Sequence, residues 1–295
     1  MAKRLRSPIV WFGGKGNMVA KILPLLPPHR TYVEPFGGGA SILISKPPSE
    51  IEVYNDLDSD LVNFFRVLRD KNKFEQFYQK VCLTPYSREE YNYCRSTWES
   101  IDDEIERAYR WFVVARMSFG GDFGHSWGYE VKTSTNHMSR SVAAWLSIID
   151  MLPQICERLM RVQIENNDFR KILQTYNSPD VLEYCDPPYV LETRKRGSYK
   201  HEMALQDHKE LVDILLGLKS MVVLSGYDHP IYQPLEDNGW TKHEYKVSCS
   251  VSGRTRQTGI LGEGAATKMQ PRTEVIWRNP AAVKQMEIKT IGVDK

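Results

Sequence analysis

Strand-like and helix-like segments alternate near both ends of this chain, and a long stretch between them does not follow the pattern. Residues 31–34 and 51–54 are short runs of strand-forming residues, and similar runs recur in the second half of the chain. Alternation of this kind favours an α/β sheet, and an interruption favours an inserted module. We therefore predict a sheet domain made of residues 1–69 and 153–295, with an inserted, mainly helical domain of residues 70–152.

Hydrophobic periodicity locates the individual elements. Asp58 or Ser59 can cap a helix that follows the second strand. Within the insert, a helix is predicted over residues 101–117, and a loop or hairpin over residues 118–129. Further strands are predicted at residues 161–165, 181–185 and 221–224, helices at 168–176 and 205–219, and a closing antiparallel pair at 242–247 and 274–277.

The charge of the chain does not by itself indicate a nucleic-acid partner, because the formal net charge is only +2. Local clusters are more informative, since groups of Lys and Arg can neutralise phosphates. One cluster is Arg194-Lys195-Arg196, and another comprises Arg254, Arg256, Lys268 and Arg272. Taken alone, each is equally consistent with a solvated surface loop.

The five cysteines are odd in number and form no Cys-x-x-Cys pair, which argues against a disulfide framework or a zinc site. The seven histidines show no metal-ligand spacing, so no metal is expected. The apolar run Pro8 to Phe12 is too short for a signal peptide, and no run is long enough to span a membrane. The sequence therefore predicts a cytoplasmic protein with no membrane partner.

A glycine cluster follows the first predicted strand directly, in the segment from Glu34 to Ala40. Glycines at such a position let the backbone approach a ligand closely, where a Cβ atom would block it. Asp56 stands at the end of the next strand, where a carboxylate can accept hydrogen bonds from both ribose hydroxyls. Glycine loops are weak signals, so a tight turn with a capping aspartate is the alternative.

A second motif is Trp11-Phe12-Gly13-Gly14-Lys15, which lacks the spacing of a P-loop. Lys15 could place its ammonium near a carboxylate such as that of methionine. The alternative is a solvated lysine in a turn, and without other motifs this alternative is favoured.

The most specific motif is Asp186-Pro187-Pro188-Tyr189, which follows the predicted strand 181–185. Two prolines fix the backbone and remove two N–H donors, so their carbonyls remain as acceptors. The Asp186 carboxylate and the Pro187 carbonyl could each accept one hydrogen of a nucleobase amine, which would aim the nitrogen lone pair at an electrophile. Tyr189 could stack on the base, an interaction worth about 1–3 kcal/mol. A rigid structural turn is the alternative.

Taken in order, these motifs resemble those of the Dam-type DNA adenine methyltransferases, and the resemblance covers most of the chain outside roughly residues 70–150. It implies a Rossmann-like methyltransferase sheet, an inserted target-recognition domain, S-adenosylmethionine as cofactor and double-stranded DNA as partner. It also implies that Trp11, Lys15, Asp56 and Asp186 line the cofactor site, and that Asp186 touches the target amine. For the cofactor site, the predicted residues are these four together with Glu34, Pro35, Phe36, Gly37, Gly38 and Gly39. For catalysis, they are Asp186, Pro187, Pro188 and Tyr189.

DNA contacts are expected from Arg116 and His125 in the insert and from Arg194, Lys195 and Arg196 after the catalytic motif. The chain departs from the family at Ala40, where a glycine is common, a mild change if a methyl group fits. Residues 119–129 only loosely resemble the recognition hairpin of enzymes that read GATC, so the target sequence stays open. A monomer or weak dimer is expected.

The predicted reaction is a direct in-line methyl transfer to a flipped-out adenine, without a covalent intermediate. Cys185 adjoins the motif but is predicted to be a buried strand residue. The alternatives are methylation of the cytosine N4 amine or of an RNA adenine, a nucleotide-dependent dehydrogenase that uses the glycine loop, and a non-catalytic DNA-binding module. An Asp at position 186 favours adenine over cytosine.

Overall fold

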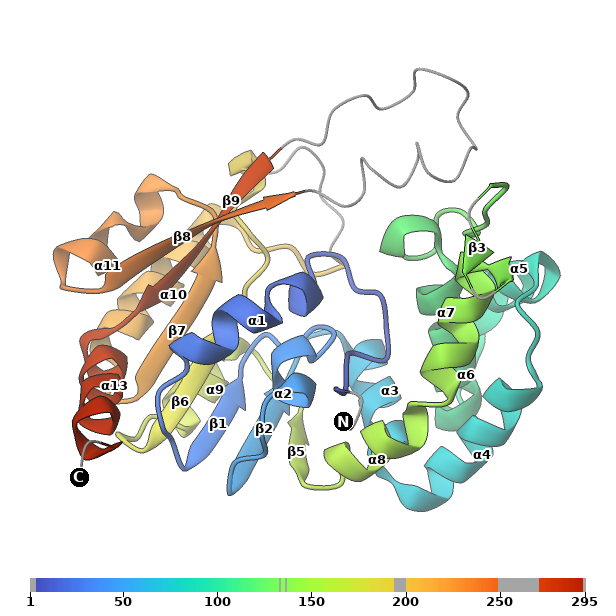
Figure 1. Cartoon of the computed structure of the whole chain (residues 1–295), viewed down its shortest axis with the longest axis horizontal. Coiled ribbons are helices and arrows are strands. Elements are labelled where there is room, and N and C mark those ends of the chain that lie inside the picture. The colour runs from blue at the N-terminus through green and yellow to red at the C-terminus, as the bar shows by residue number, and fades with distance from the viewer. Residues whose placement is uncertain (1–3, 133, 136, 194–199, 249–270, 294–295) are drawn as a thin grey trace. The chain divides into compact units, whose positions relative to one another are not determined.

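The structure is a computed structural model that describes residues 4–132, 134–135, 137–193, 200–248 and 271–293 (Figure 1). The chain folds as two compact units. The one that we call the sheet unit comprises residues 15–62, 161–246 and 273–295, and the one that we call the helical unit comprises residues 1–14, 63–160 and 247–272.

A seven-stranded sheet forms the sheet unit, in the order β5-β2-β1-β6-β7-β9-β8. The five strands from β5 to β7 run parallel, and β9 runs antiparallel to β7. The chain winds outward from β1 in both directions, which creates the topological switch point at which α/β sheets bind ligands. The strands are β1 (Thr31–Glu34), β2 (Ile51–Asn55), β5 (Val162–Glu165), β6 (Val181–Cys185), β7 (Met221–Gly226), β8 (Thr241–Ser248) and β9 (Pro271–Arg278).

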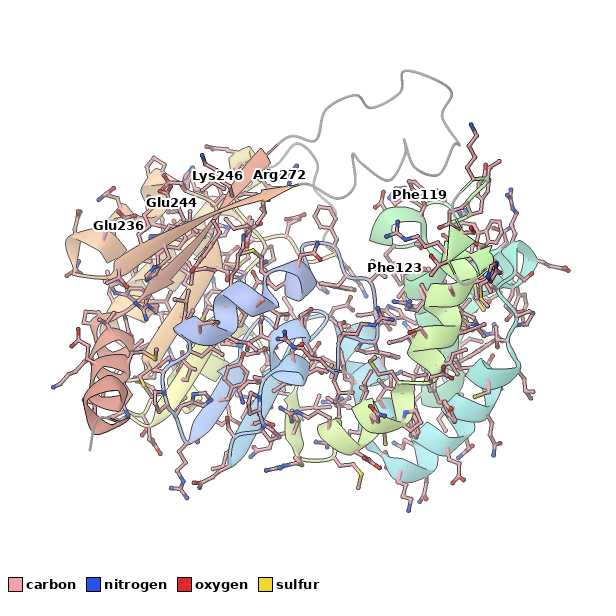
Figure 2. The ribbon with its side chains drawn as sticks, in the orientation of Figure 1. Phe119, Phe123, Glu236, Glu244, Lys246 and Arg272 are labelled. Atoms are coloured by element: carbon pink, nitrogen blue, oxygen red, sulfur yellow. The ribbon has the colours of Figure 1, made fainter. Side chains whose placement is uncertain are left out.

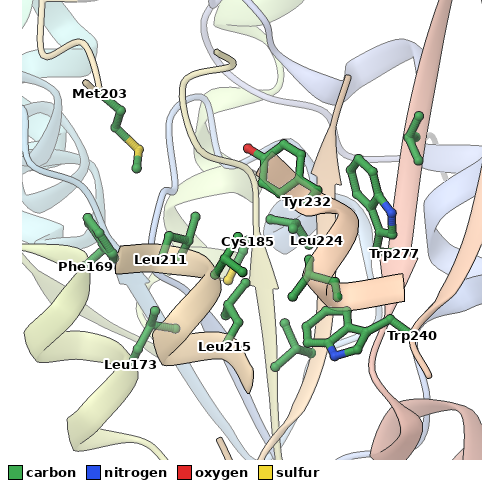
Figure 3. Close-up of a cluster of buried hydrophobic side chains, with 14 of the residues drawn as sticks. Phe169, Leu173, Cys185, Met203, Leu211, Leu215, Leu224, Tyr232, Trp240 and Trp277 are labelled. Carbon is green, nitrogen blue, oxygen red and sulfur yellow. The ribbon is translucent and has the colours of Figure 1, made fainter. Parts of the chain in front are cut away.

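The central strands are buried on both faces, as a parallel sheet requires. On one face, α9 (Phe169–Thr175) and α10 (Leu205–Gly217) pack on β6 and β7 through a hydrophobic cluster that includes Leu173, Leu211 and Leu224 (Figure 3). The short helices α1 (Val19–Ile22) and α2 (Ser41–Ser45) lie on the other side of the sheet (Figure 1). The remaining helices of this unit are α11 (Gln233–Asp237) and α13 (Pro280–Val293).

In residues 63–160, as far as the structure describes them, the helical unit consists of helices with their connecting loops and a small hairpin of β3 (Ser134–Thr135) and β4 (Met138–Ser139). Its core lies around Trp111 and Phe112, and Phe64 stacks on Phe112 at 5.4 Å between ring centroids. The helices are most of α3 (Ser59–Arg69), α4 (Lys71–Leu83), α5 (Arg88–Thr97), α6 (Glu104–Met117), α7 (Arg140–Ile149) and α8 (Leu152–Leu159).

The mixed α/β fold confirms the predicted class, and the strands predicted from residue 31 to residue 224 lie within two residues of their observed bounds. The helix predicted over 101–117 begins later, at Glu104, because the Asp103 side chain accepts a hydrogen bond from the Glu106 N–H and caps it. Strands β8 and β9 are neighbours at one edge of the sheet. The helix α13 was not predicted. Within the described residues, no helix is long and apolar enough to cross a membrane.

Candidate active site

The carboxyl ends of β1, β2 and β6 carry the three polar motifs of the sheet unit. Glu34 ends β1, Asp56 follows β2, and Asp186 follows β6. Because β1 pairs in parallel with both β2 and β6, the carboxyl ends of the three strands lie next to one another on the same side of the sheet. We call this side the sheet edge of the site. The fold therefore gathers the predicted glycine loop, the predicted ribose acceptor and the Asp-Pro-Pro-Tyr motif at the switch point.

The glycine loop is tied closely to β2. The Gly37 N–H donates to the Asn55 carbonyl at 2.7 Å, and the Tyr54 hydroxyl donates to the Gly38 carbonyl at 2.8 Å. A Cβ atom added at Gly37 would lie 2.2 Å from the Tyr54 ring, so this position accepts only glycine without rearrangement. Gly38 has a positive φ of 46°, which also favours glycine.

Ala40 adopts a left-handed conformation, with φ 52° and ψ 34°, immediately before α2. Its methyl group is fully buried, so the side chain fits the site. The backbone conformation nevertheless costs about 1–2 kcal/mol for an L-residue other than glycine. The departure from the family motif is therefore accommodated by packing at an energetic cost in the backbone.

Asp56 binds the loop and retains capacity for a ligand. Its Oδ2 atom accepts from the Gly38 N–H at 2.8 Å and its Oδ1 atom from the Asp58 N–H at 2.9 Å. Burial raises the pKa of Asp56 to about 6, against the effect of these hydrogen bonds. Since a carboxylate offers about four lone-pair directions, two remain for hydroxyl donors.

Lys15 and Asp186 form a buried ion pair, with 2.7 Å between Nζ and Oδ1 and side chains 6% and 17% exposed. Burial raises the pKa of Asp186 to about 6, and the Lys15 ammonium limits that rise. Burial alone would lower the pKa of Lys15, but Asp186 and then Glu274 raise it above its usual value. The interpretation of Lys15 as a solvated lysine is therefore wrong. Its ammonium pairs with a carboxylate of the protein itself, that of Asp186.

Tyr189 lies in the same buried group. Its hydroxyl donates to Glu274 Oε2 at 2.7 Å, and its ring meets Tyr227 edge-on at 4.5 Å between centroids. The Lys15 ammonium lies 4.7 Å from the centroid of the Tyr189 ring. Glu274, from β9, is a residue that the sequence did not single out, because nothing in a strand pattern indicates a hydrogen bond to a residue 85 positions away.

Glu34 is buried and holds the loop. Its Oε1 atom accepts from the Tyr32 hydroxyl and from the Leu43 N–H of α2, both at 2.8 Å. Burial raises the pKa of Glu34 to about 8. This carboxyl group is thus placed to fix the start of α2, and a direct contact with the cofactor stays a prediction.

The other predicted site residues differ in their surroundings. Phe36 packs against Phe169, at 5.1 Å between ring centroids, and Pro35 accepts a hydrogen bond from the Asn55 side chain at 2.8 Å. Trp11 belongs to the helical unit, where its ring lies 6.1 Å from that of Trp111. Gly39 and Pro187 are buried, Pro188 is half-buried, and Arg194, Lys195 and Arg196 lie outside the described residues, as do Arg254, Arg256 and Lys268.

Comparison with known proteins decides the family. The family model described as D12 class N6 adenine-specific DNA methyltransferase matches residues 11–248, which is most of the chain. The chain belongs to this family. The match includes the Trp11–Lys15 segment, the glycine loop, Asp56 and the Asp-Pro-Pro-Tyr motif.

Curated relatives of this D12-class methyltransferase have related names. It is 29% identical over 280 residues to a type II methyltransferase, M1.LlaDCHI, of Lactococcus lactis, covering 88% of this chain and 94% of the relative. It is 27% identical over 219 residues to a DNA adenine methylase of Vibrio cholerae, covering 72% and 76% of the two chains. A DNA N-6-adenine-methyltransferase of Escherichia phage P1 is 24% identical, but this chain spans only 34% of its length.

Two residues of the helical unit that were predicted to contact DNA have different environments. The His125 side chain is 74% exposed in the loop after α6, with Nε2 3.7 Å from Asp122 Oδ1. Arg116, in the last turn of α6, is half-buried, and its guanidinium donates to the Ala144 carbonyl at 3.1 Å. Nearby in this loop, Phe119 and Phe123 are labelled in Figure 2, and Phe123 packs on Trp111 at 5.3 Å between centroids.

Proposed function

We propose that this chain transfers a methyl group from S-adenosylmethionine to the N6 amine of an adenine that is flipped out of double-stranded DNA. The observation that carries the proposal is the position of Asp186, a buried carboxylate at the sheet edge where the glycine loop and Asp56 also meet. Family membership supplies the reaction, and the site supplies the residues that would perform it.

The residues at the sheet edge suit S-adenosylmethionine. Gly37 packs its backbone directly against the Tyr54 ring, which holds the glycine loop beside Asp56, and Asp56 retains acceptor capacity for ribose hydroxyls. Lys15 is proposed to complete the cofactor site, and the contact expected from Trp11 stays a prediction from the sequence. When bound, the cofactor would supply an electrophilic methyl group on a positively charged sulfur.

Asp186 and Pro187 would prepare the amine. Each accepts one N–H of the adenine amine, which favours a pyramidal nitrogen with its lone pair directed at the methyl group. The Lys15 ammonium lies 2.7 Å from Asp186 Oδ1, so an incoming N–H must bind another lone pair of the carboxylate or displace the ammonium. Because the pKa of Asp186 is about 6, the carboxylate is mostly ionised at neutral pH.

Tyr189 would receive the flipped base by stacking. Without DNA its ring lies under the Lys15 ammonium, which occupies the kind of position that a stacked base would take. Stacking of the base on this face of the ring would require the Lys15 side chain to move from it. The Glu274 carboxylate holds the Tyr189 hydroxyl and would keep the ring oriented during this exchange.

We further propose that the helical unit reads the target sequence, as the inserted domain predicted over residues 70–152 would do. Its aromatic and arginine content suits contacts to bases and phosphates. His125 is proposed to contact DNA from its exposed position. Arg194, Lys195 and Arg196 stay proposals from the sequence alone.

The test is an Asp186→Ala variant assayed for transfer of tritiated methyl groups to adenine-unmethylated genomic DNA. We expect binding of DNA to persist while methyl transfer is lost. Asp213→Ala, an exposed position on α10, is the matched control. Normal turnover by the Asp186→Ala variant would refute the proposal.

Nucleoside analysis of the product decides between the candidate acceptors. We expect N6-methyladenine in double-stranded DNA. Formation of N4-methylcytosine, or transfer to RNA alone, would replace the proposed substrate. Sequencing the methylated adenines in DNA from an expressing host would then give the recognition sequence.

A further inference from the structure

Two further aspartates follow Asp56 where the chain passes from β2 into α3, and we call residues 56–60 the aspartate turn. The Asp56 carboxylate accepts from the Asp58 N–H at 2.9 Å, and the Asp58 carboxylate accepts from the Asp60 N–H at 3.0 Å. Asp58 therefore caps the start of α3, and each of these two carboxylates fixes the backbone two positions later. The position of the Asp56 carboxylate thus depends on how firmly the aspartate turn is held.

The Lys200 ammonium bridges the other two acids of the turn. It lies 3.2 Å from Asp58 Oδ1 and 2.7 Å from Asp60 Oδ2, and the side chains of these acids are only 8% and 6% exposed. Burial lowers the pKa of Lys200, but Asp60 and then Asp58 raise it above its usual value, so the ammonium is charged at neutral pH. One cation thus balances two buried carboxylates that would otherwise repel each other.

Lys200 acts on the turn from a distant part of the sequence, since it lies between the catalytic motif and α10 and 140 positions after Asp60. Its side chain is 49% exposed and adds little to a hydrophobic core, so its contribution here is its charge. The Asn166 amide holds the beginning of the turn, by donating to the Asp56 carbonyl at 2.8 Å and the Leu57 carbonyl at 3.2 Å. Lys200 therefore holds the end of the turn that Asn166 does not reach.

Two links join Lys200 to the Asp56 carboxylate. The first is geometric, because Lys200 binds the side chain of Asp58 and the N–H of Asp58 binds Asp56. The second is electrostatic. Burial is the main cause that raises the pKa of Asp56, and the Asp58 charge adds to the rise, which a cation bound to Asp58 offsets. Both links favour a fixed and ionised carboxylate, the form that accepts hydrogen bonds from two hydroxyls.

We propose that Lys200 is a positioning residue for the cofactor: by bridging the other two acids of the aspartate turn, it holds the Asp56 carboxylate where it accepts the ribose hydroxyls of S-adenosylmethionine. The inference rests on the proposed function and deepens it, because it names a residue that sets cofactor affinity through another residue. Loss of the ammonium should weaken recognition of the ribose and leave methyl transfer from bound cofactor unchanged.

The test is calorimetric binding of S-adenosylhomocysteine and of its 2′,3′-dideoxy analogue, which lacks both ribose hydroxyls. Lys200→Met removes the charge, Lys200→Arg keeps it, and Lys209→Met removes a charge from an exposed position on α10 as the control. We expect Lys200→Met to bind S-adenosylhomocysteine about tenfold more weakly than the parent protein. Lys200→Arg and Lys209→Met should bind it nearly as tightly as the parent protein does.

The analogue shows whether Lys200 acts through Asp56. Since the analogue offers no hydroxyl to this carboxylate, its affinity should be nearly the same in Lys200→Met and in the parent protein. Circular dichroism melting checks that each variant is folded. Lys200→Gln, which replaces the charge by a polar side chain, is measured in parallel and should show the same selective loss if Met destabilises the fold. Parent-like affinity for S-adenosylhomocysteine without the ammonium, or an equal loss for both ligands, would overturn the proposal.

Steady-state kinetics separate positioning from a general structural role. In Lys200→Met, the KM for S-adenosylmethionine should rise about tenfold while kcat stays near the parent value. A fall in kcat at unchanged KM would also count against the proposal.

The outcomes distinguish this inference from the proposed function. Methyl transfer by the parent protein, with unchanged cofactor affinity in Lys200→Met, would overturn the role of Lys200 alone. Binding of S-adenosylhomocysteine that depends on Lys200 and on the ribose hydroxyls, without methyl transfer by the parent protein, would overturn the proposed reaction and leave the role of Lys200 in place.

Discussion

Replacing Lys15 by Met should move the acidic limb of the pH–rate profile of methyl transfer. In the structure, the Lys15 ammonium lies 2.7 Å from Asp186 Oδ1 and is the main group that lowers the pKa of this carboxyl, which stands at about 6. An opposite charge at such a distance lowers the pKa of a carboxyl group by about 1–3. Removing the ammonium should therefore shift the acidic limb upward by roughly 1–3 pH units.

The expected loss depends on pH and is recoverable. For a shift of about 2 pH units, the ionised fraction of Asp186 at pH 7 falls roughly tenfold and returns near pH 9. The free energy of unfolding should also depend on the ionisation of Asp186. Because burial holds the folded-state pKa of Asp186 above its usual value of 3.8, its contribution to stability is complete below that value and is lost as pH rises through about 6. In Lys15→Met this loss should continue to higher pH.

The assay is single-turnover transfer of tritiated methyl groups at saturating S-adenosylmethionine, from pH 5.5 to 9.5, with melting temperatures measured in the same buffers. Saturation removes the effect of weaker cofactor binding, since Lys15 is also proposed to contact the cofactor. Lys209→Met, an exposed position on α10, is the control. An acidic limb that coincides in the Lys15→Met and parent proteins would refute the reasoning, because the ion pair would then not set the charge of Asp186.

Three further substitutions test the loop and the tyrosine. Gly37→Ala places a methyl group 2.2 Å from the Tyr54 ring, so it should lower the free energy of unfolding in urea by about 1–3 kcal/mol. The variant should also lose the stabilisation that the cofactor gives to the parent protein. Unchanged unfolding would contradict the tight contact. Ala40→Gly relieves a left-handed alanine and should raise the free energy of unfolding by about 1 kcal/mol or less, so a clear decrease would count against the strain. Glu274→Leu leaves the buried Tyr189 hydroxyl without its acceptor and should lower kcat more than cofactor affinity, whereas Glu274→Gln, which keeps an acceptor, should retain most activity; equal kcat in both would show that the hydrogen bond is not needed.

The strands and the sheet edge of the site could be predicted from sequence because they depend on local patterns. Short apolar runs that end in Gly or Asx turns locate β1, β2 and β6, and parallel pairing then brings their carboxyl ends together. The positions of Glu34, Asp56 and Asp186 at that edge follow directly. The chemical roles of these residues stay predictions, because they concern ligands.

Contacts between distant segments could not be predicted. The resemblance predicts Lys15 and Asp186 in one cofactor site, but only the fold reveals that the two side chains form an ion pair across 171 positions of sequence. Glu274 is one polar residue in an edge-strand pattern, and its role becomes visible only through the Tyr189 hydroxyl. The contact of the Arg116 guanidinium with the Ala144 carbonyl likewise depends on helix packing, since the sequence indicates the charge and not the surroundings.

The ion pair between Lys15 and Asp186 has a consequence for the release of methylated DNA. An unmodified adenine amine brings two N–H donors to the motif, the methylated amine brings one, and an ammonium brings three. The Lys15 ammonium should therefore displace a methylated amine from Asp186, and re-form the ion pair, more readily than it displaces an unmodified amine. We expect fully methylated duplex to be a weak competitive inhibitor, and strong product inhibition in steady-state assays would show that Lys15 does not compete in this way.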